Sequence, residues 1–279
     1  MILKKLGFVL SAGILLIFWA GSVHAVQGQW VGFVSLFPKP GVVLSELEKQ
    51  KLSRRIQQAS GNFSNDFNPE KGAVETIQFH KTVSYTLNGQ PVSRKPLGMI
   101  RVESLKRQAI EKFIREVSSE LNTNFEIETQ FGVTGQLNYT DTATLQRLKD
   151  QAPTRGTGRD QPNAVVLPLS KTAEWWGLPQ EKREQYFFKH PEVFSSQQLG
   201  HNAIGFKYIN KIFRKLYHSR STGGDQDFIT YFEFADTNAE IFDQLLGGLR
   251  DVALNPEWKF VIEKPLFQGR RVQSPQEMF

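Results

Sequence analysis

The sequence predicts an α+β fold built from two tandem ferredoxin-like halves, which together form a dimeric α+β barrel-type domain. Three observations support this prediction. Strand and helix patterns alternate along the 279 residues, they recur in a similar order in the two halves, and a polar segment rich in Pro and Gly separates the halves. We therefore expect an N-terminal half at 26–150, a linker at 151–163 and a C-terminal half at 164–279.

The first half predicts the order strand, helix, strand, helix, strand. Its strand patterns alternate apolar and polar residues, whereas its helical patterns repeat apolar residues at three- and four-residue spacing. Strands are expected at 30–37, at 73–87 as one long strand or two short ones, and at 125–137, with helices at 44–58 and from Ser104 to near Leu121.

The second half repeats this theme. Strands are expected at 164–169, 227–234 and 258–262, and helices at 171–190, 199–217 and 238–249. In the second of these strands Phe228, Thr230, Phe232 and Phe234 occupy alternate positions, which predicts that they share one face of the sheet.

The first 25 residues have the pattern of a secretory leader. Lys4 and Lys5 precede an apolar run of about 15 residues, which is shorter than the roughly 20 that a membrane-spanning helix needs. The segment ending at Ala25 resembles a cleavage site for small residues. We expect a signal peptide at 1–25, cleavage after Ala25, and a mature protein in the periplasm that is not anchored in a membrane.

Charge and residue types narrow the function classes. The formal charge of +6 falls to +4 without Lys4 and Lys5, and the bases are interspersed with acids, so we do not expect nucleic-acid binding. There is no cysteine, which excludes disulfides, iron–sulfur clusters, thiolate catalysis and covalent haem attachment through cysteine. The motifs GxxxxGK[ST], HExxH and GxSxG are also missing from the sequence.

For each of the five histidines a surface or interior structural role is the simpler interpretation. His201 stands out from the others because the nearby Gly200 and Gly205 would let a flat cofactor approach. Arg214 lies among apolar residues and would need an anionic partner if buried, although a solvent-directed side chain is the simpler interpretation. If one helix spanned 199–217, the Cα atoms of His201 and Arg214 would lie about 20 Å apart. The sequence leaves open whether the two side chains meet.

A second cluster consists of Lys171, Trp175 and Trp176. The lysine and the first tryptophan are one helical turn apart, and an aromatic pocket with a cation at its rim would suit a carboxylate. From these residues alone, one core tryptophan and one surface tryptophan is the better explanation of the pair.

The stretch 164–233 resembles the chlorite dismutase family through several motifs that occur in order. They are AVVLPL followed by Lys171 and Glu174-Trp175-Trp176, then GHNAIG at 200–205, RKLYHS at 214–219 and DFITYFE at 227–233. Weaker similarity covers the segment around Tyr139 and the C-terminal tail, whereas 26–124 is matched mainly by element order.

This resemblance implies an enzyme with haem b that converts chlorite to chloride and dioxygen through a ferryl and hypochlorite intermediate. It implies His201 as the iron ligand, Arg214 as the catalytic arginine on the opposite face, and Glu257 as the acceptor of the second imidazole proton. Lys171, Trp175, Trp176 and Tyr139 would line the haem and its propionates. The resemblance further implies a homo-oligomer, with a pentamer as the expected form.

The spacing leaves one alternative ligand. His190 has the spacing from Trp176 seen in some members of the family, whereas His201 has the spacing to Arg214, and an inserted loop would reconcile the two. Two other functions also fit the residues: a haem enzyme of the peroxidase type, and a non-catalytic periplasmic haem-binding protein. A carrier would not need the cation of Arg214.

Overall fold

The computed structural model describes residues 28–63, 76–135, 139–153 and 160–279. The expected signal peptide lies outside the described residues. The strands are β1 (Trp30–Pro38), β2 (Ile77–Leu87), β3 (Gln90–Pro91), β4 (Gly98–Ser104), β5 (Phe125–Val133), β6 (Asn163–Lys171), β7 (Ile212–His218), β8 (Phe228–Phe234), β9 (Val261–Glu263) and β10 (Leu266–Val272). The helices are α1 (Glu46–Gly61), α2 (Arg107–Leu121), α3 (Thr142–Gln151), α4 (Ala173–Gly177), α5 (Gln180–Glu184), α6 (His201–Phe206) and α7 (Ala239–Arg250), with 3₁₀ turns at Asp236–Asn238, Pro256–Phe260 and Pro275–Met278.

The strands form one antiparallel sheet that closes on itself. Their order is β10-β2-β4-β1-β5-β7-β8-β6, and β10 also pairs with β6, so the two ends of this row meet. The short strands β3 and β9 are attached to β2 and β6. The result is a barrel, so the row of strands has no open end.

Each half contributes a four-strand ferredoxin-like unit to this barrel, as the sequence predicts. The first half has the order β2-β4-β1-β5 and the second has β7-β8-β6-β10, so the same permutation occurs twice. The halves join unequally. β10 pairs with β2 from Leu266 to Val272, whereas β5 and β7 pair at Val133 and His218.

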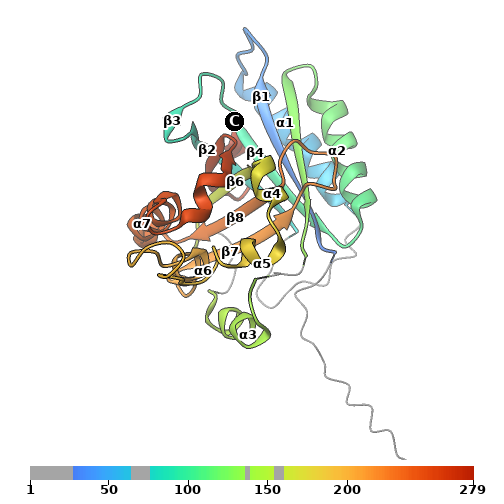
Figure 1. Cartoon of the computed structure of the whole chain (residues 1–279). Coiled ribbons are helices and arrows are strands. Elements are labelled where there is room, and N and C mark those ends of the chain that lie inside the picture. The colour runs from blue at the N-terminus through green and yellow to red at the C-terminus, as the bar shows by residue number, and fades with distance from the viewer. Residues whose placement is uncertain (1–27, 64–75, 136–138, 154–159) are drawn as a thin grey trace, which may run out of the picture.

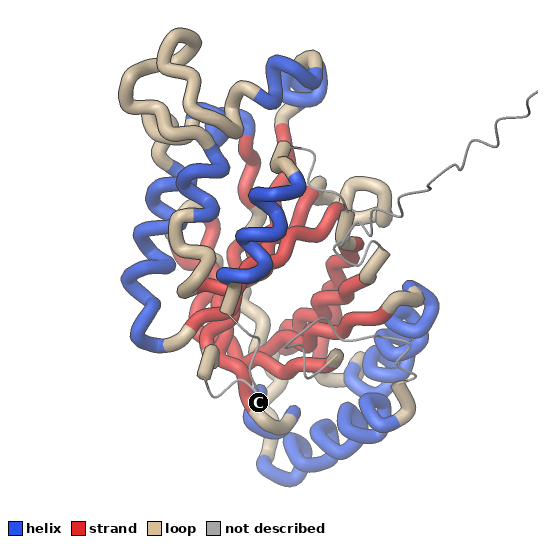
Figure 2. Tube along the Cα trace, turned by 90° about the horizontal axis from the view of Figure 1, so that it is seen from below, coloured by secondary structure: helices blue, strands red, loops and turns tan. Residues whose placement is uncertain are grey.

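Helices cover the outside of the barrel (Figures 1 and 2). The first half packs α1 and α2 on its outer face, where Ile56, Phe113 and Val117 are buried against β1 and β4. The second half packs α7 on its outer face through Phe242 and Leu245. Burying one face of each sheet against helices is the main source of hydrophobic stabilisation in such layered folds.

The interior of the barrel is partly polar. Arg101 and Glu103 of β4 form an ion pair of 2.6 Å, and neither side chain is exposed. Arg101 also donates to the hydroxyl of Tyr217 on β7 at 2.7 Å, and Gln78 of β2 donates to Glu233 of β8 at 3.2 Å. These bonds cross between the halves, so directional contacts as well as apolar packing fix how the two units face each other.

The prediction of one helix over 199–217 is wrong. Only His201–Phe206 is helical, and Ile212–His218 is strand β7, paired with β8 from Ile212↔Phe234 to His218↔Phe228. The apolar residues of this segment fit both a helical and a strand period, and the ladder with β8 decides between them. This correction moves Arg214 from a helix to a sheet.

Other boundaries also differ from the prediction. The helix expected at 171–190 consists of the short α4 and α5, because Lys171 still belongs to β6 and Pro179 separates the two helices. The strand expected at 258–262 is mostly the 3₁₀ turn Pro256–Phe260. The sequence interpretation missed α3, β4 and β10.

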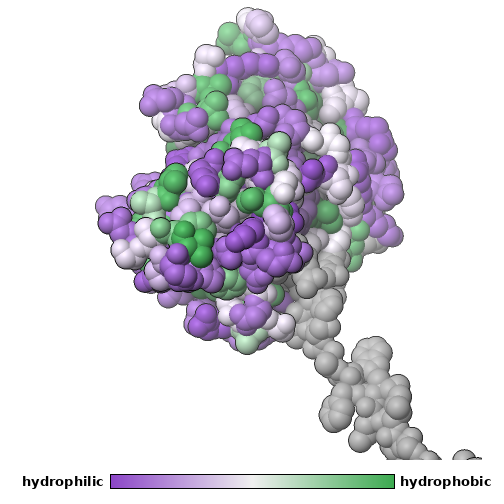
Figure 3. Space-filling model, in the orientation of Figure 1, coloured by the Kyte–Doolittle hydropathy of each residue, from purple (hydrophilic) through white to green (hydrophobic). Residues whose placement is uncertain are grey.

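The described surface is mostly hydrophilic in the view of Figure 3, with separate apolar spots. Exposed large apolar residues such as Val43, Val83 and Ile262 come from different elements. No helix in the described part of the chain combines the length and the apolar character needed to cross a bilayer.

Candidate functional site

Helix α6 presents His201 at its first turn. Gly200 precedes it with a φ of 86°, a backbone conformation that favours glycine, and a Cβ there would lie 2.7 Å from the backbone of Phe188. The backbone NH of His201 donates to the carbonyl of Tyr186 at 3.1 Å. The start of α6 is therefore anchored to the segment that follows α5, and the imidazole has a defined position.

The His201 ring is held by Glu257 of the 3₁₀ turn Pro256–Phe260. Nδ1 of His201 lies 2.7 Å from Oε2 of Glu257, whose side chain is 4% exposed. Burial alone raises the pKa of Glu257, but the charge of Lys171 and the contact with His201 outweigh it and hold the pKa well below its usual value. Because an ionised carboxylate only accepts hydrogen bonds, Nδ1 is the donor in this contact.

Lys171, at the end of β6, forms a cluster with His201 and Glu257. Its Nζ donates to Oε1 of Glu257 and lies 4.7 Å from the ring centroid of Trp175. Burial lowers the pKa of Lys171, and the neighbouring carboxylate of Glu257 opposes this shift. The resemblance implied a place for Lys171 along the haem, and the structure gives its ammonium group a direct partner in Glu257.

Arg214 reaches the same histidine from the other side. It lies on the outer face of β7 with Ile212 and Leu216, and its Nη2 is 3.3 Å from Nε2 of His201. The 20 Å separation considered for a single helix therefore does not apply, because a strand that follows α6 brings the two side chains together.

The environment of Arg214 is apolar. Among the described residues, its fully buried Nη1 has no hydrogen-bond partner, and the guanidinium lies 5.9 Å from the ring centroid of Phe232. Burial lowers the pKa of Arg214 to about 10, partly offset by the charge of Glu257. The group thus remains a cation at neutral pH, with one donor available for an anion.

Aromatic side chains surround the cluster. Tyr139 stacks on Phe187 with ring centroids 4.2 Å apart, and Phe187 lies 5.2 Å from the His201 ring. Trp175 is 3% exposed and packs against Phe187 at 6.2 Å. Residues near His201 therefore form an aromatic wall of the kind that suits a planar apolar ligand.

Trp176 lies at the edge of this region. Its Nε1 donates to Oδ2 of Asp227 at 3.0 Å, and the guanidinium of Arg220 lies 4.1 Å above its ring. Asp227 also accepts from the backbone NH of Lys171 at 2.8 Å. The two adjacent tryptophans thus have different environments, one buried in the wall and one tied to a carboxylate near the surface.

The alternative ligand His190 lies outside this cluster. Its Nδ1 is 3.0 Å from Oε1 of Glu192, a pair with side chains that are 35% and 66% exposed. The contacts with the buried carboxylate of Glu257 and with the guanidinium of Arg214 belong to His201 instead, which favours His201 as the ligand.

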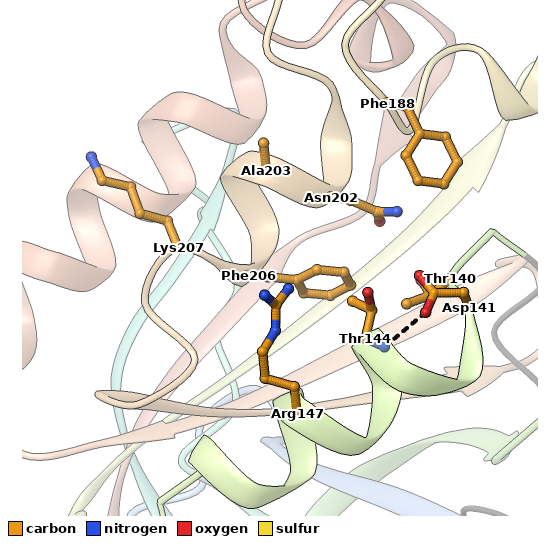
Figure 4. Close-up of a pocket in the computed structure, with 9 residues that line it drawn as sticks. All are labelled: Thr140, Asp141, Thr144, Arg147, Phe188, Asn202, Ala203, Phe206 and Lys207. Atoms are coloured by element: carbon orange, nitrogen blue, oxygen red, sulfur yellow. Dashed lines mark hydrogen bonds between the residues drawn. The ribbon is translucent and has the colours of Figure 1, made fainter.

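A cavity of ≈ 360 Å³ lies beside the cluster, between α3 and α6 (Figure 4). Its lining consists of Thr140, Asp141, Thr144, Arg147, Phe188, Asn202, Ala203, Phe206 and Lys207. Asn202, next to His201, donates to the carbonyl of Tyr139 at 2.8 Å. Neither His201 nor Arg214 lines this cavity, so the titratable cluster, rather than this cavity, defines the candidate site.

Two neighbours of the cluster had no role in the sequence interpretation. Phe187 links Tyr139 to His201, and Asp227 links Trp176 to the backbone of Lys171. Asp227 stood in a matched motif, so the resemblance could have indicated it. Phe187 lies in a stretch expected to be helical, with no motif around it.

The known proteins that are similar to this chain include chlorite dismutases. No family model matches the chain. A chlorite dismutase from Ideonella dechloratans is 33% identical over 136 residues, which cover 46% of this chain and 40% of that protein. The chain thus matches less than half the length of this relative.

Solved structures match over a greater length. A crystal structure of a double mutant of chlorite dismutase from Candidatus Nitrospira defluvii has a TM-score of 0.65 at 20% identity, covering 90% of this chain and 94% of that one. The structure of the same enzyme in complex with imidazole has a TM-score of 0.65 at 21% identity, covering 91% and 94%. The chain therefore has the chlorite dismutase fold, and over 136 residues its sequence is similar to that of a chlorite dismutase.

Proposed function

We propose that this protein is a haem-dependent chlorite dismutase that converts chlorite to chloride and dioxygen. The observation that carries the proposal is the pair His201 and Arg214, which approach one another from α6 and from β7. Nε2 of His201 is not used by Glu257, and Arg214 is a half-buried cation whose Nη1 has no partner among the described residues. Such a pair suits a metal centre with an anionic substrate on its far side.

The residues fit haem b. A single imidazole that donates its other NH to a carboxylate is the usual arrangement of a haem or metal ligand, and the carboxylate raises the basicity of the ligating nitrogen. Glu257 supplies this carboxylate, and Lys171 keeps it ionised. The aromatic wall of Tyr139, Phe187 and Trp175 would line the macrocycle. When bound, haem would supply an iron centre capable of oxygen-atom transfer with chlorite.

Arg214 would hold the anion during this reaction. The conversion ClO₂⁻ → Cl⁻ + O₂ balances without any proton, so the group that retains the oxyanion should not protonate it. A guanidinium meets this requirement, because it donates charge-assisted hydrogen bonds and keeps its proton at neutral pH. Its pKa of about 10 is lowered by burial yet lies well above neutrality.

The proposal extends to location and assembly. The leader pattern at 1–25 supports export to the periplasm with removal of that segment. The relationship to chlorite dismutases supports a homo-oligomer, for which we expect a pentamer. Light scattering of the purified mature protein would test the number of copies, and N-terminal sequencing of the exported protein would test the cleavage after Ala25.

The deciding experiment measures dioxygen. The protein is reconstituted with haem b, its absorption spectrum is recorded, and chlorite is added in an oxygen electrode. We expect one dioxygen for each chloride formed. A protein that binds haem but releases no dioxygen would contradict the proposal and favour a peroxidase-type enzyme or a haem carrier.

Two substitutions assign the residues. Arg214→Ala should retain the haem spectrum and lose most of the dioxygen evolution, because the oxyanion is no longer held. His201→Ala should lose haem affinity, whereas the matched variant His190→Ala should keep it. Haem retention in His201→Ala together with loss in His190→Ala would transfer the ligand role to His190.

A further inference from the structure

The contact between Arg214 and His201 uses the atom that a haem iron would need. Nδ1 of His201 donates to Glu257, and Nε2 faces a guanidinium that can only donate, so Nε2 is the ring nitrogen that offers a lone pair. Nη2 of Arg214 lies 3.3 Å from this atom and, as part of a protonated guanidinium, donates to it. One lone pair cannot bind an iron atom and accept this hydrogen bond together.

In its position beside His201, which we call the inner position, the guanidinium of Arg214 has only part of its hydrogen-bonding capacity satisfied. Nη2 has a partner in His201, whereas the buried Nη1 has none among the described residues. The cluster also holds two cations, Arg214 and Lys171, against the single carboxylate of Glu257. Arg214 therefore lies in a place where it can be displaced, because its full set of hydrogen bonds is not met there.

Gly205 makes this inner position accessible. A Cβ at residue 205 would lie 2.6 Å from Nη1 of Arg214, and 3.7 Å from Nε2 of His201. The guanidinium thus occupies the space that a side chain at residue 205 would fill. An alanine there would push the flexible end of Arg214 away from His201, while the clearance to the imidazole stays within ordinary van der Waals contact.

We propose that Arg214 competes with the haem iron for Nε2 of His201, so that cofactor loading requires the guanidinium to withdraw from the inner position that Gly205 allows. This step rests on the proposed haem site and adds a second role for the arginine. The same side chain first occupies Nε2 of His201. Once displaced to the far side of the cofactor, it faces the substrate.

The test measures haem association rather than turnover. Haem is mixed with the haem-free full chain in a stopped-flow instrument, and the rise of the Soret band gives the association rate for the parent, Arg214→Leu and Gly205→Ala. Arg94→Leu serves as the matched control, because Arg94 pairs with Glu126 on the exposed surface of the first half. Circular dichroism confirms that each variant is folded.

We expect Arg214→Leu and Gly205→Ala to bind haem on the order of 10-fold faster than the parent, since both remove a hydrogen bond from a charged donor. Arg94→Leu should bind at the parental rate. Gly205→Ala keeps the arginine, so a faster rate in both variants separates displacement from a mere loss of charge. Haem binding by Arg214→Leu at the parental rate, or more slowly, would overturn the competition and leave the haem site intact. A parent that binds no haem at all would overturn the proposed function as well.

Discussion

The buried His80 makes the stability of the protein depend on pH in a specific way. His80 lies on β2, is 0% exposed inside the barrel, and has its Nε2 3.5 Å from the hydroxyl of Tyr231. Burial lowers its pKa from 6.5 to about 3; the charge of Glu233 opposes this shift, and those of Arg271 and Arg101 add to it. In the folded protein the imidazole therefore stays neutral where the unfolded chain takes up a proton.

Proton linkage gives the sign and the size of this change in the free energy of unfolding with pH. Because the folded pKa is depressed, the contribution to stability is present above pH 6.5 and is lost as the pH falls toward 3. Between pH 7 and pH 5 the unfolded state gains most of a proton and the folded state gains almost none. The two pKa values give a loss of about 2 kcal/mol in the free energy of unfolding over this interval.

The assay compares the parent with His80→Gln. Urea unfolding at pH 8, 7 and 5 gives the free energy of unfolding of each protein, and the substitution removes only the histidine contribution. From pH 7 to pH 5 the parent should lose about 2 kcal/mol more than the variant. Between pH 8 and pH 7 the two should run nearly parallel, which is the internal control. Parallel curves down to pH 5 would refute a neutral buried His80.

Three further predictions concern packing and paired charges. Glu257→Gln should lower the free energy of unfolding by about 3 kcal/mol in urea titration, because it leaves Lys171 buried without its carboxylate; an unchanged value would show that the cluster relaxes into water. Gly132→Ala should cost about 1–3 kcal/mol, since its Cβ would lie 2.6 Å from Cβ of Tyr217 where β5 meets β7; a neutral result would mean that this junction can open. Ser45→Ala should cost about 1 kcal/mol through loss of the capping box of α1, with the unfolding midpoint as the measure and an unshifted midpoint as the contrary outcome.

The sequence by itself determined the class of fold and most of the strands that build it. The repeated order of patterns predicts two ferredoxin-like halves, because a period of two or of 3.6 residues follows from which face an element buries. The alternation of Phe228, Thr230, Phe232 and Phe234 predicts one face of β8, and Phe232 and Phe234 both pack against Phe242 of α7. A local pattern of this kind predicts the element correctly because its apolar face packs against the neighbouring layer.

The sequence does not predict the structure of segments whose residues fit more than one pattern. β4 carries Arg101 and Glu103 at buried positions, and such charges suggest an exposed segment unless partners from other strands are known. The stretch 199–217 fits a helix as well as a strand. Its pairing with β8 is a contact between distant parts of the chain, so no local period reveals it.

The candidate site shows the same division. The family resemblance pointed to His201, Glu257 and Arg214 one by one, but their meeting depends on three separate elements, α6, the turn Pro256–Phe260 and β7. Only the tertiary structure brings Nε2 of His201 within 3.3 Å of Arg214, and leaves His190 beside Glu192 near the surface. The physical reason is that residue type is local, whereas the distance between two side chains depends on how the whole barrel closes.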